Sequence, residues 1–86
     1  MKIAVAGLGY VGLSNAVLLS QNHEVIGLDL DKERVRMVND RQAPIVDPEL
    51  ENFFANKKLN LVATTNQKEA YSSADFVIVA LSLIHI

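Results

Sequence analysis

Three glycines near the start of the chain have the spacing needed to bind a phosphate group. Gly7, Gly9 and Gly12 stand in the string Gly-Leu-Gly-Tyr-Val-Gly, which fits the pattern G-x-G-x-x-G. In that pattern the first glycine permits a tight turn, the second lets a diphosphate approach the backbone, and the third lets a helix pack closely on a strand. The free N–H groups at the helix start, at the positive end of its dipole, would then bind the phosphates.

The glycine pattern predicts a ligand only when a strand precedes it and a helix follows, because turns often contain glycine. Lys2 to Ala6 reads as a buried strand, and residues 10–21 carry apolar side chains at helical spacing. A glycine-rich turn without a ligand is the alternative. We expect the N–H groups of Tyr10 and Val11 to contact the diphosphate. The Val11 side chain belongs either to the core or against the cofactor, and Tyr10 is expected to be half exposed.

An aspartate follows the second apolar run and completes the pattern. Asp29 lies about 20 residues after the glycines, where a carboxylate can accept hydrogen bonds from both hydroxyls of an adenosine ribose. Its charge would repel a 2′-phosphate, so the sequence favours NAD over NADP. Arg34 complicates this preference, because a nearby arginine can accommodate that phosphate. Arg34 can instead lie over the adenine or near the ribose, or be a solvated helix charge.

The elements that position these residues alternate along the chain. Asp31, Asp47 and Asn66 are expected helix caps, and Asn22 is an expected left-handed residue at the end of the first helix. Strands alternating with helices predict an α/β fold with a Rossmann-like, doubly wound parallel sheet, truncated to about four strands in the order 3-2-1-4. The expected strands are 2–6, 24–30, 59–63 and 76–80, and the expected helices are 10–21, 32–40, 48–56 and 66–71.

Composition excludes several classes of function. The chain has 86 residues, which allows one domain at most. A net charge of −2 gives no basic surface for nucleic acid or an anionic membrane. The absence of cysteine excludes a disulfide framework, a thiolate metal site and a cysteine nucleophile within these residues. We predict a soluble cytoplasmic protein with no metal site, nucleic-acid partner or membrane segment.

Longer strings of residues point to a family. Residues 7–13 read Gly-Leu-Gly-Tyr-Val-Gly-Leu and residues 44–47 read Pro-Ile-Val-Asp. Together with Asn-His-Glu-Val at 22–25 and Ala-Asp-Phe-Val-Ile at 74–78, they resemble the N-terminal part of the UDP-glucose 6-dehydrogenases, in the UDP-glucose/GDP-mannose dehydrogenase family. The resemblance covers residues 1–80, and it is most similar to the bacterial enzymes.

The resemblance implies a role as the cofactor-binding part of a larger enzyme. Enzymes of this family oxidise UDP-glucose to UDP-glucuronate with two NAD, through a cysteine that holds the intermediate as a thiohemiacetal and then a thioester. That cysteine and the UDP-sugar site would lie beyond this chain, which would hold no catalytic residue and be inactive by itself. The full-length protein is expected to be a homodimer. The NAD contacts carried over are Gly7, Gly9, Tyr10, Val11, Gly12, Asp29 and Arg34.

The last six residues depart from the family. Where its members usually have Thr-Pro-Thr, residues 81–86 read Leu-Ser-Leu-Ile-His-Ile. We interpret residues 1–80 as a partial NAD-binding domain and 81–86 as a non-family tail, typical of a truncated or misassembled reading frame. Sequencing the DNA downstream tests this hypothesis.

Three other functions are open at this point. The first is another sugar-nucleotide 6-dehydrogenase, acting on GDP-mannose or a UDP-N-acetyl sugar. The second is a regulatory NAD-binding module without catalysis, which the loop and capped helix at residues 44–56 argue against. The third is an inert fragment that folds poorly.

Overall fold

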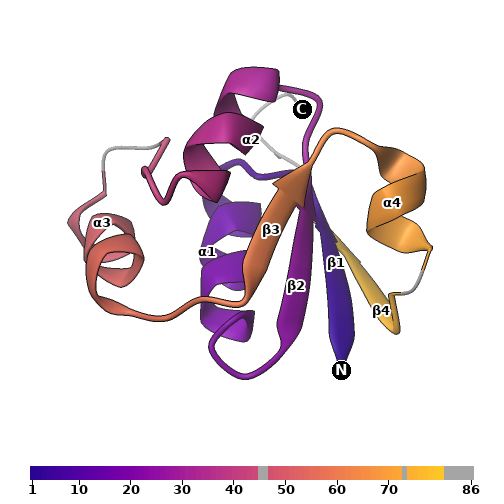
Figure 1. The fold of residues 1–86 in the computed structure, drawn as a ribbon, viewed down its shortest axis with the longest axis horizontal. Helices are drawn as coiled ribbons and strands as arrows, with labels where there is room; N and C mark the ends of the chain where they lie inside the picture. Colours follow the sequence, from indigo (N-terminus) through magenta and orange to yellow (C-terminus); the bar gives the residue numbers. More distant parts are fainter. Residues whose placement is uncertain (45–46, 73, 81–86) are drawn as a thin grey trace.

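The computed structural model describes residues 1–44, 47–72 and 74–80 (Figure 1). Strands and helices follow one another in the predicted order, but the second strand and the first helix are both two residues shorter than predicted. The tail expected at residues 81–86 lies outside the described residues. The elements are β1 (Lys2–Ala6), α1 (Tyr10–Leu19), β2 (Glu24–Leu28), α2 (Lys32–Asn39), α3 (Pro48–Asn56), β3 (Leu61–Thr64), α4 (Gln67–Tyr71) and β4 (Phe76–Val79).

The four strands form one parallel sheet in the order β3-β2-β1-β4, which confirms the predicted topology. Val5 of β1 stands opposite Gly27 of β2 on one side and Ile78 of β4 on the other. The chain moves outward from β1 through β2 to β3 and then returns to β4. The carboxyl ends of β1 and β4 therefore flank the point where the winding reverses, which is where open α/β sheets bind ligands.

Helices cover both faces of the sheet, but unequally. α1, α2 and α3 lie on one side, and the short α4 lies on the other (Figure 1). The main core fills the first side, where alternate strand residues point. Ala4 and Ala70 are fully buried outside that core cluster. The core cluster consists of Ile3, Val5, Leu8, Leu13, Ala16, Val17, Val25, Val38, Leu50, Phe54, Leu59, Leu61 and Ala63.

Three helices begin at side-chain caps, as predicted. Asp31 Oδ1 accepts hydrogen bonds from the N–H groups of the second and third residues of α2, at 3.0 and 3.1 Å. Asp47 does the same for α3, at 2.9 and 3.2 Å. Asn66 accepts one bond, from the N–H of Glu69 at 3.1 Å. These caps satisfy N–H groups that have no partner inside a helix.

The left-handed residue expected at Asn22 occurs instead at Arg41. α1 ends at Leu19, and Ser20 after it is right-handed, with φ −70° and ψ −9°. Asn22 does not have positive φ, so the prediction for Asn22 was wrong. Arg41, after the end of α2, is the one non-glycine residue with positive φ (61°) in the described part of the chain. Its guanidinium donates to the carbonyl oxygens of Val38, Leu59 and Leu61 at 2.9, 3.1 and 2.8 Å. These bonds fasten the end of α2 to the start of β3.

The two edges of the sheet differ. On the outer side of β3, the Asn39 carboxamide pairs with Ala63, accepting from its N–H at 2.8 Å and donating to its carbonyl at 3.0 Å. Asn39 thus pairs with both backbone groups of Ala63, while Arg41 pairs with the carbonyl groups of Leu59 and Leu61 on the same side. On the opposite edge, β4 exposes apolar side chains, with Phe76 57%, Val77 48% and Val79 59% accessible.

In the described part of the chain, no helix has the length and hydropathy to cross a membrane.

Candidate functional site

The glycine turn brings the start of α1 onto the ends of β1 and β4. Gly7 has φ +93°, and a Cβ there would lie 2.6 Å from the carbonyl oxygen of Ala80. At Gly12 a Cβ would lie 1.7 Å from the carbonyl oxygen of Gly7. Any side chain at either position would force the turn apart. The glycines therefore hold the helix start directly over the strand end, as the sequence predicted.

The start of α1 is the one uncapped helix start in the described structure. Gly9 occupies the capping position, no side chain caps it, and the first turn has no acidic residue. The first helical hydrogen bond runs from the N–H of Leu13 to the carbonyl of Gly9 at 2.8 Å, so the N–H groups before Leu13 have no helical acceptor. A Cβ at Gly9 would meet nothing within 4 Å. The backbone is thus bare and approachable, as anion binding requires.

Tyr10 and Val11, which begin α1, are both exposed, at 54% and 61%. The interpretation of Val11 as a core residue was therefore wrong, because the buried face of α1 begins at Gly12 and Leu13. An exposed valine beside bare N–H groups leaves an apolar surface at the mouth of the turn.

The carboxylate of Asp29 faces the glycine turn. Its Oδ2 accepts a hydrogen bond from the N–H of Leu8 at 2.8 Å, and its Oδ1 accepts one from the N–H of Asp31 at 2.9 Å. The backbone N–H of Asp29 donates to the carbonyl of Thr64 at 3.1 Å, which anchors it to the end of β3. The turn after β1 and the acid after β2 therefore form one continuous polar surface.

Packing below the turn fixes the Leu8 end of this contact. The Leu8 side chain is fully buried, and it lies over β2 at Gly27, where a Cβ would come within 2.8 Å of Leu8 Cδ2. Gly27 is therefore needed because Leu8 occupies the space of its side chain. This contact was not predicted from the sequence, although a glycine inside an otherwise apolar strand often marks such a close approach.

Asp29 remains charged over a wide pH range. Burial raises the pKa of its carboxyl, but the backbone hydrogen bonds from Asp31 and Leu8 and the guanidinium of Arg34 together outweigh burial. The net result is a pKa below the ordinary value for aspartate. A carboxylate that is 12% exposed and ionised is a strong acceptor for hydroxyl groups.

Arg34 lies beside Asp29 rather than in solvent. Its Nη1 is 3.3 Å from Asp29 Oδ2, and its side chain is 34% exposed. A carboxylate offers about four acceptor positions, of which Leu8, Asp31 and Arg34 take three. One ribose hydroxyl can therefore bond at once, and a second requires Arg34 to move.

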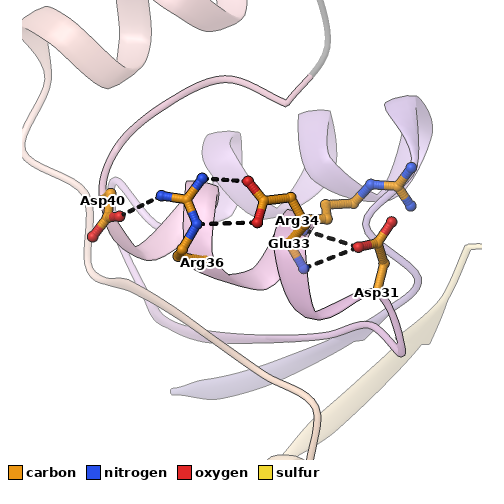
Figure 2. A network of polar contacts seen from close by, with 5 residues as sticks. All are labelled: Asp31, Glu33, Arg34, Arg36 and Asp40. Carbon is orange, nitrogen blue, oxygen red and sulfur yellow. Dashed lines mark hydrogen bonds and ion pairs between the residues drawn. The ribbon is translucent and has the colours of Figure 1, made fainter.

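The other charges of α2 are paired among themselves. Figure 2 shows Arg36 between Glu33 and Asp40, with the Arg34 side chain extending away from this group. Arg36 donates to both oxygens of Glu33 and, at 3.1 Å, to Asp40. The hydrogen bond and charge of Glu33 raise the pKa of Arg36. This exposed network leaves Arg34 as the arginine of α2 that reaches the site.

A link between the glycine turn and α3 was not predicted. The negative charge of the nearby Asp47 carboxylate raises the pKa of Tyr10. Both residues line a pocket of about 140 Å³ between α1 and α3, with Ser14 and Phe53 among its other walls. Asp47 thus caps α3 and also lies close enough to the first residue of α1 for its charge to act on it. The cap was visible in the sequence, whereas the partner depends on how the two helices pack.

The predicted site residues lie at one end of the sheet, on the turn after β1, the first residues of α1, the segment after β2 and the first turn of α2. Among the described residues, no group of histidine, cysteine, aspartate and glutamate could hold a metal ion.

Comparison with known proteins agrees with this geometry. The model of the UDP-glucose/GDP-mannose dehydrogenase family, NAD binding domain, matches residues 1–82. The UDP-glucose 6-dehydrogenase of Campylobacter jejuni is 46% identical over 82 residues, which cover 93% of this chain and 21% of that protein. The GDP-mannose 6-dehydrogenase of Azotobacter vinelandii is 42% identical over 73 residues, covering 81% of this chain and 17% of that protein.

A solved structure shows the same arrangement of elements. The GDP-mannose dehydrogenase from Pseudomonas aeruginosa, in a ternary complex, superposes with a TM-score of 0.86 and 35% identity, over 95% of this chain and 20% of that one. The chain spans about a fifth of the length of the curated relatives that it matches.

Proposed function

Since the chain belongs to the UDP-glucose/GDP-mannose dehydrogenase family, as an NAD-binding domain, we propose that it is the cofactor-holding N-terminal part of a UDP-glucose 6-dehydrogenase. Such an enzyme oxidises the C6 alcohol of UDP-glucose to a carboxylate. Among the two relatives named above, the higher identity is to the enzyme named for UDP-glucose, at 46% against 42%.

The main support for a cofactor site is the hydrogen bond between the Leu8 N–H and the Asp29 carboxylate. In a dinucleotide the diphosphate is attached to the adenosine ribose through one carbon, so the groups that bind them must be neighbours. The Leu8 N–H lies in the glycine turn, and the carboxylate that accepts from it is 12% exposed. This contact supports a single ligand that spans both.

Each part of the site has a role in this proposal. The N–H groups of Tyr10, Val11 and Gly12 would bind the diphosphate at the bare start of α1, and Gly9 would let it approach. The exposed Val11 side chain would pack against the cofactor. Asp29 would accept a hydrogen bond from the ribose and repel a 2′-phosphate, which favours NAD over NADP.

Arg34 has the secondary role. Because its guanidinium already neutralises part of the Asp29 charge, it would orient the carboxylate in the free protein and move aside for the second ribose hydroxyl. Its position beside Asp29 also leaves it within reach of a base attached to that ribose.

When bound, NAD would supply the hydride acceptor for such an oxidation, and the residues described here would bind and orient it. The sequence contains no cysteine, so we propose that the cysteine nucleophile, the UDP-sugar site and the surface for a homodimer belong to other parts of a longer protein. By this proposal the 86 residues alone are inactive. A cytoplasmic location stays a prediction from the sequence.

Calorimetry with NAD and NADP tests the cofactor site, and we expect NAD to bind more tightly. Equal or tighter binding of NADP would reject the role of Asp29. Formation of NADH by the intact protein, measured with UDP-glucose and separately with GDP-mannose, tests the substrate. A higher kcat/KM for GDP-mannose would instead identify the enzyme as a GDP-mannose 6-dehydrogenase. That alternative is supported by the 42% identity to the Azotobacter vinelandii enzyme.

A further inference from the structure

The glycine turn is joined to the end of β2 at three successive positions of that strand and the segment after it. The side chain of Leu8 lies over Gly27, where a Cβ would come within 2.8 Å of Leu8 Cδ2 and 2.9 Å of Leu8 Cδ1. The N–H of Gly7 donates to the carbonyl of Leu28 at 2.7 Å. The N–H of Leu8 donates to Asp29 Oδ2 at 2.8 Å. Leu8 therefore contacts the core with its side chain and the acid with its backbone.

The side chain of Leu8 has no free space in which to adjust. It is fully buried and belongs to the main core cluster. Protein interiors are close-packed, so an atom added beside such a side chain displaces it. Because the side chain and the N–H belong to one residue, a displacement would be passed on to the bond with Asp29 and, in the next residue, to Gly9.

Gly27 can influence the site only through this contact. It lies inside β2, is buried, and stands opposite Val5 of β1. The space that its side chain would fill is occupied by Leu8, so no ligand reaches it. Any effect of Gly27 on cofactor binding would therefore have to pass through the position of Leu8.

We propose that Gly27 and Leu8 are positioning residues that set the preference for NAD over NADP, an inference that rests on the proposed function. The absence of a side chain at Gly27 lets the turn lie close enough to β2 for the Leu8 N–H to hold Asp29. Displacement of Leu8 would lengthen that bond and let the carboxylate rotate toward the guanidinium of Arg34, which already lies 3.3 Å from the same oxygen. A carboxylate paired more closely with Arg34 would bind the ribose less well and repel a 2′-phosphate less.

Calorimetry on the intact protein tests this assignment through the ratio of the NADP dissociation constant to the NAD dissociation constant. A displaced turn alters diphosphate binding in both dinucleotides, whereas the ratio reports on Asp29. In Gly27→Ala we expect the ratio to fall about fivefold or more, a part of what a full hydrogen bond to a charged group supplies. Leu59→Ala is the control, because Leu59 is buried just before β3, at the opposite end of the sheet. It should lower the stability and leave the ratio unchanged.

A double variant separates positioning from general damage to the core. Leu8→Val removes one methylene group where Gly27→Ala adds one, so the two changes together conserve the packed volume. We expect Leu8→Val with Gly27→Ala to recover most of the preference for NAD, although it carries two core substitutions. If the double variant kept the low ratio, the effect would not pass through Leu8 and the proposal would fail.

The pKa of the Asp29 carboxyl, followed by NMR titration, gives a readout that a loss of stability does not move. Burial raises this pKa, and the hydrogen bonds from Asp31 and Leu8 together with Arg34 outweigh burial. A longer bond from Leu8 in Gly27→Ala should therefore bring the pKa closer to the ordinary aspartate value. The double variant should lower it again.

A milder variant covers the case in which Gly27→Ala does not fold. Leu8→Val alone loosens the same contact without adding an atom, and it should lower the ratio about twofold. An unchanged ratio in Gly27→Ala, or in Leu8→Val where that is the variant that folds, would overturn the role of the pair. Failure of the wild-type protein to bind either dinucleotide would instead reject the proposed function.

Discussion

The N–H of Leu8 donates a 2.8 Å hydrogen bond to Oδ2 of Asp29. Leu8 cannot move away easily, because its buried side chain fills the space above Gly27. The bond therefore sets the distance between the turn and the carboxylate before any ligand arrives. Preorganisation of this kind lowers the cost of ordering the site on binding.

Gly9 and Gly7 should separate binding from folding. In Gly9→Ala the new Cβ projects into open space, so the free energy of unfolding should fall by less than about 1 kcal/mol. The same methyl group would stand where the diphosphate approaches, so NAD affinity should fall at least about tenfold. Gly7→Ala should instead destabilise the fold by about 2 kcal/mol or more, because of its positive φ and the nearby Ala80 carbonyl. Urea unfolding and calorimetry measure the two effects, and a Gly9→Ala protein with full affinity would contradict the phosphate site.

Asp29 should matter more than Arg34 for NAD affinity. Asp29→Ala removes a charged acceptor, so binding should weaken by roughly ten- to a hundredfold. Arg34→Ala should change affinity less than about fivefold, because it also frees an acceptor position on Asp29. Arg36→Ala, on the exposed ion-pair network of α2, is the control and should leave affinity unchanged. The reverse order of the two site variants in calorimetry would show that the ribose contact is misassigned.

Asp29 should also contribute an acid-sensitive part of the stability. Its pKa is lowered in the folded protein, so the charged form favours folding. That contribution is complete above the ordinary aspartate pKa and is lost as the pH falls through the lower folded value. The difference in free energy of unfolding between the wild-type protein and Asp29→Asn should therefore shrink from neutral pH to about pH 3. A difference that stays constant in urea titrations at both pH values would contradict the charged hydrogen bonds.

Arg41 should stabilise the fold through its side chain despite its backbone conformation. Arg41→Ala removes three hydrogen bonds and keeps the left-handed conformation, so it should cost about 2 kcal/mol or more. Arg41→Gly should cost about 1 kcal/mol less than alanine, because glycine adopts positive φ without strain. Thermal and urea unfolding measure both, with Arg36→Ala as an exposed control. If glycine destabilised more than alanine, the positive φ at this position would be refuted.

The strand order and the helix caps could be predicted because both depend on short-range patterns. Apolar runs at regular spacing defined β1 to β4, and Asp31, Asp47 and Asn66 precede their helices by one residue. The facing of Asp29 toward the turn also followed, since parallel strands bring their carboxyl ends to one edge.

The remaining features depend on tertiary contacts that leave little trace in the sequence. The left-handed residue is Arg41 rather than Asn22. The Arg41 guanidinium bonds to three carbonyl groups, on α2, on the segment before β3 and on β3 itself, and the propensity of one residue cannot show such contacts. The proximity of Tyr10 and Asp47 likewise requires α1 and α3 to meet. The sequence left open whether Val11 is buried in the core, because helical spacing alone does not show which side of α1 packs on the sheet; in the structure Val11 is exposed.

The pairing of Asn39 with Ala63 determines at which edge of the sheet a further strand could be added. An incoming strand would have to displace that carboxamide and the Arg41 guanidinium to hydrogen-bond with β3. Beside β4 it would meet uncovered valine and phenylalanine side chains instead. Additional strands, whether from the same polypeptide or from another molecule, should therefore pair with β4. At the β3 edge, side chains of this chain already bond to backbone groups that an added strand would need.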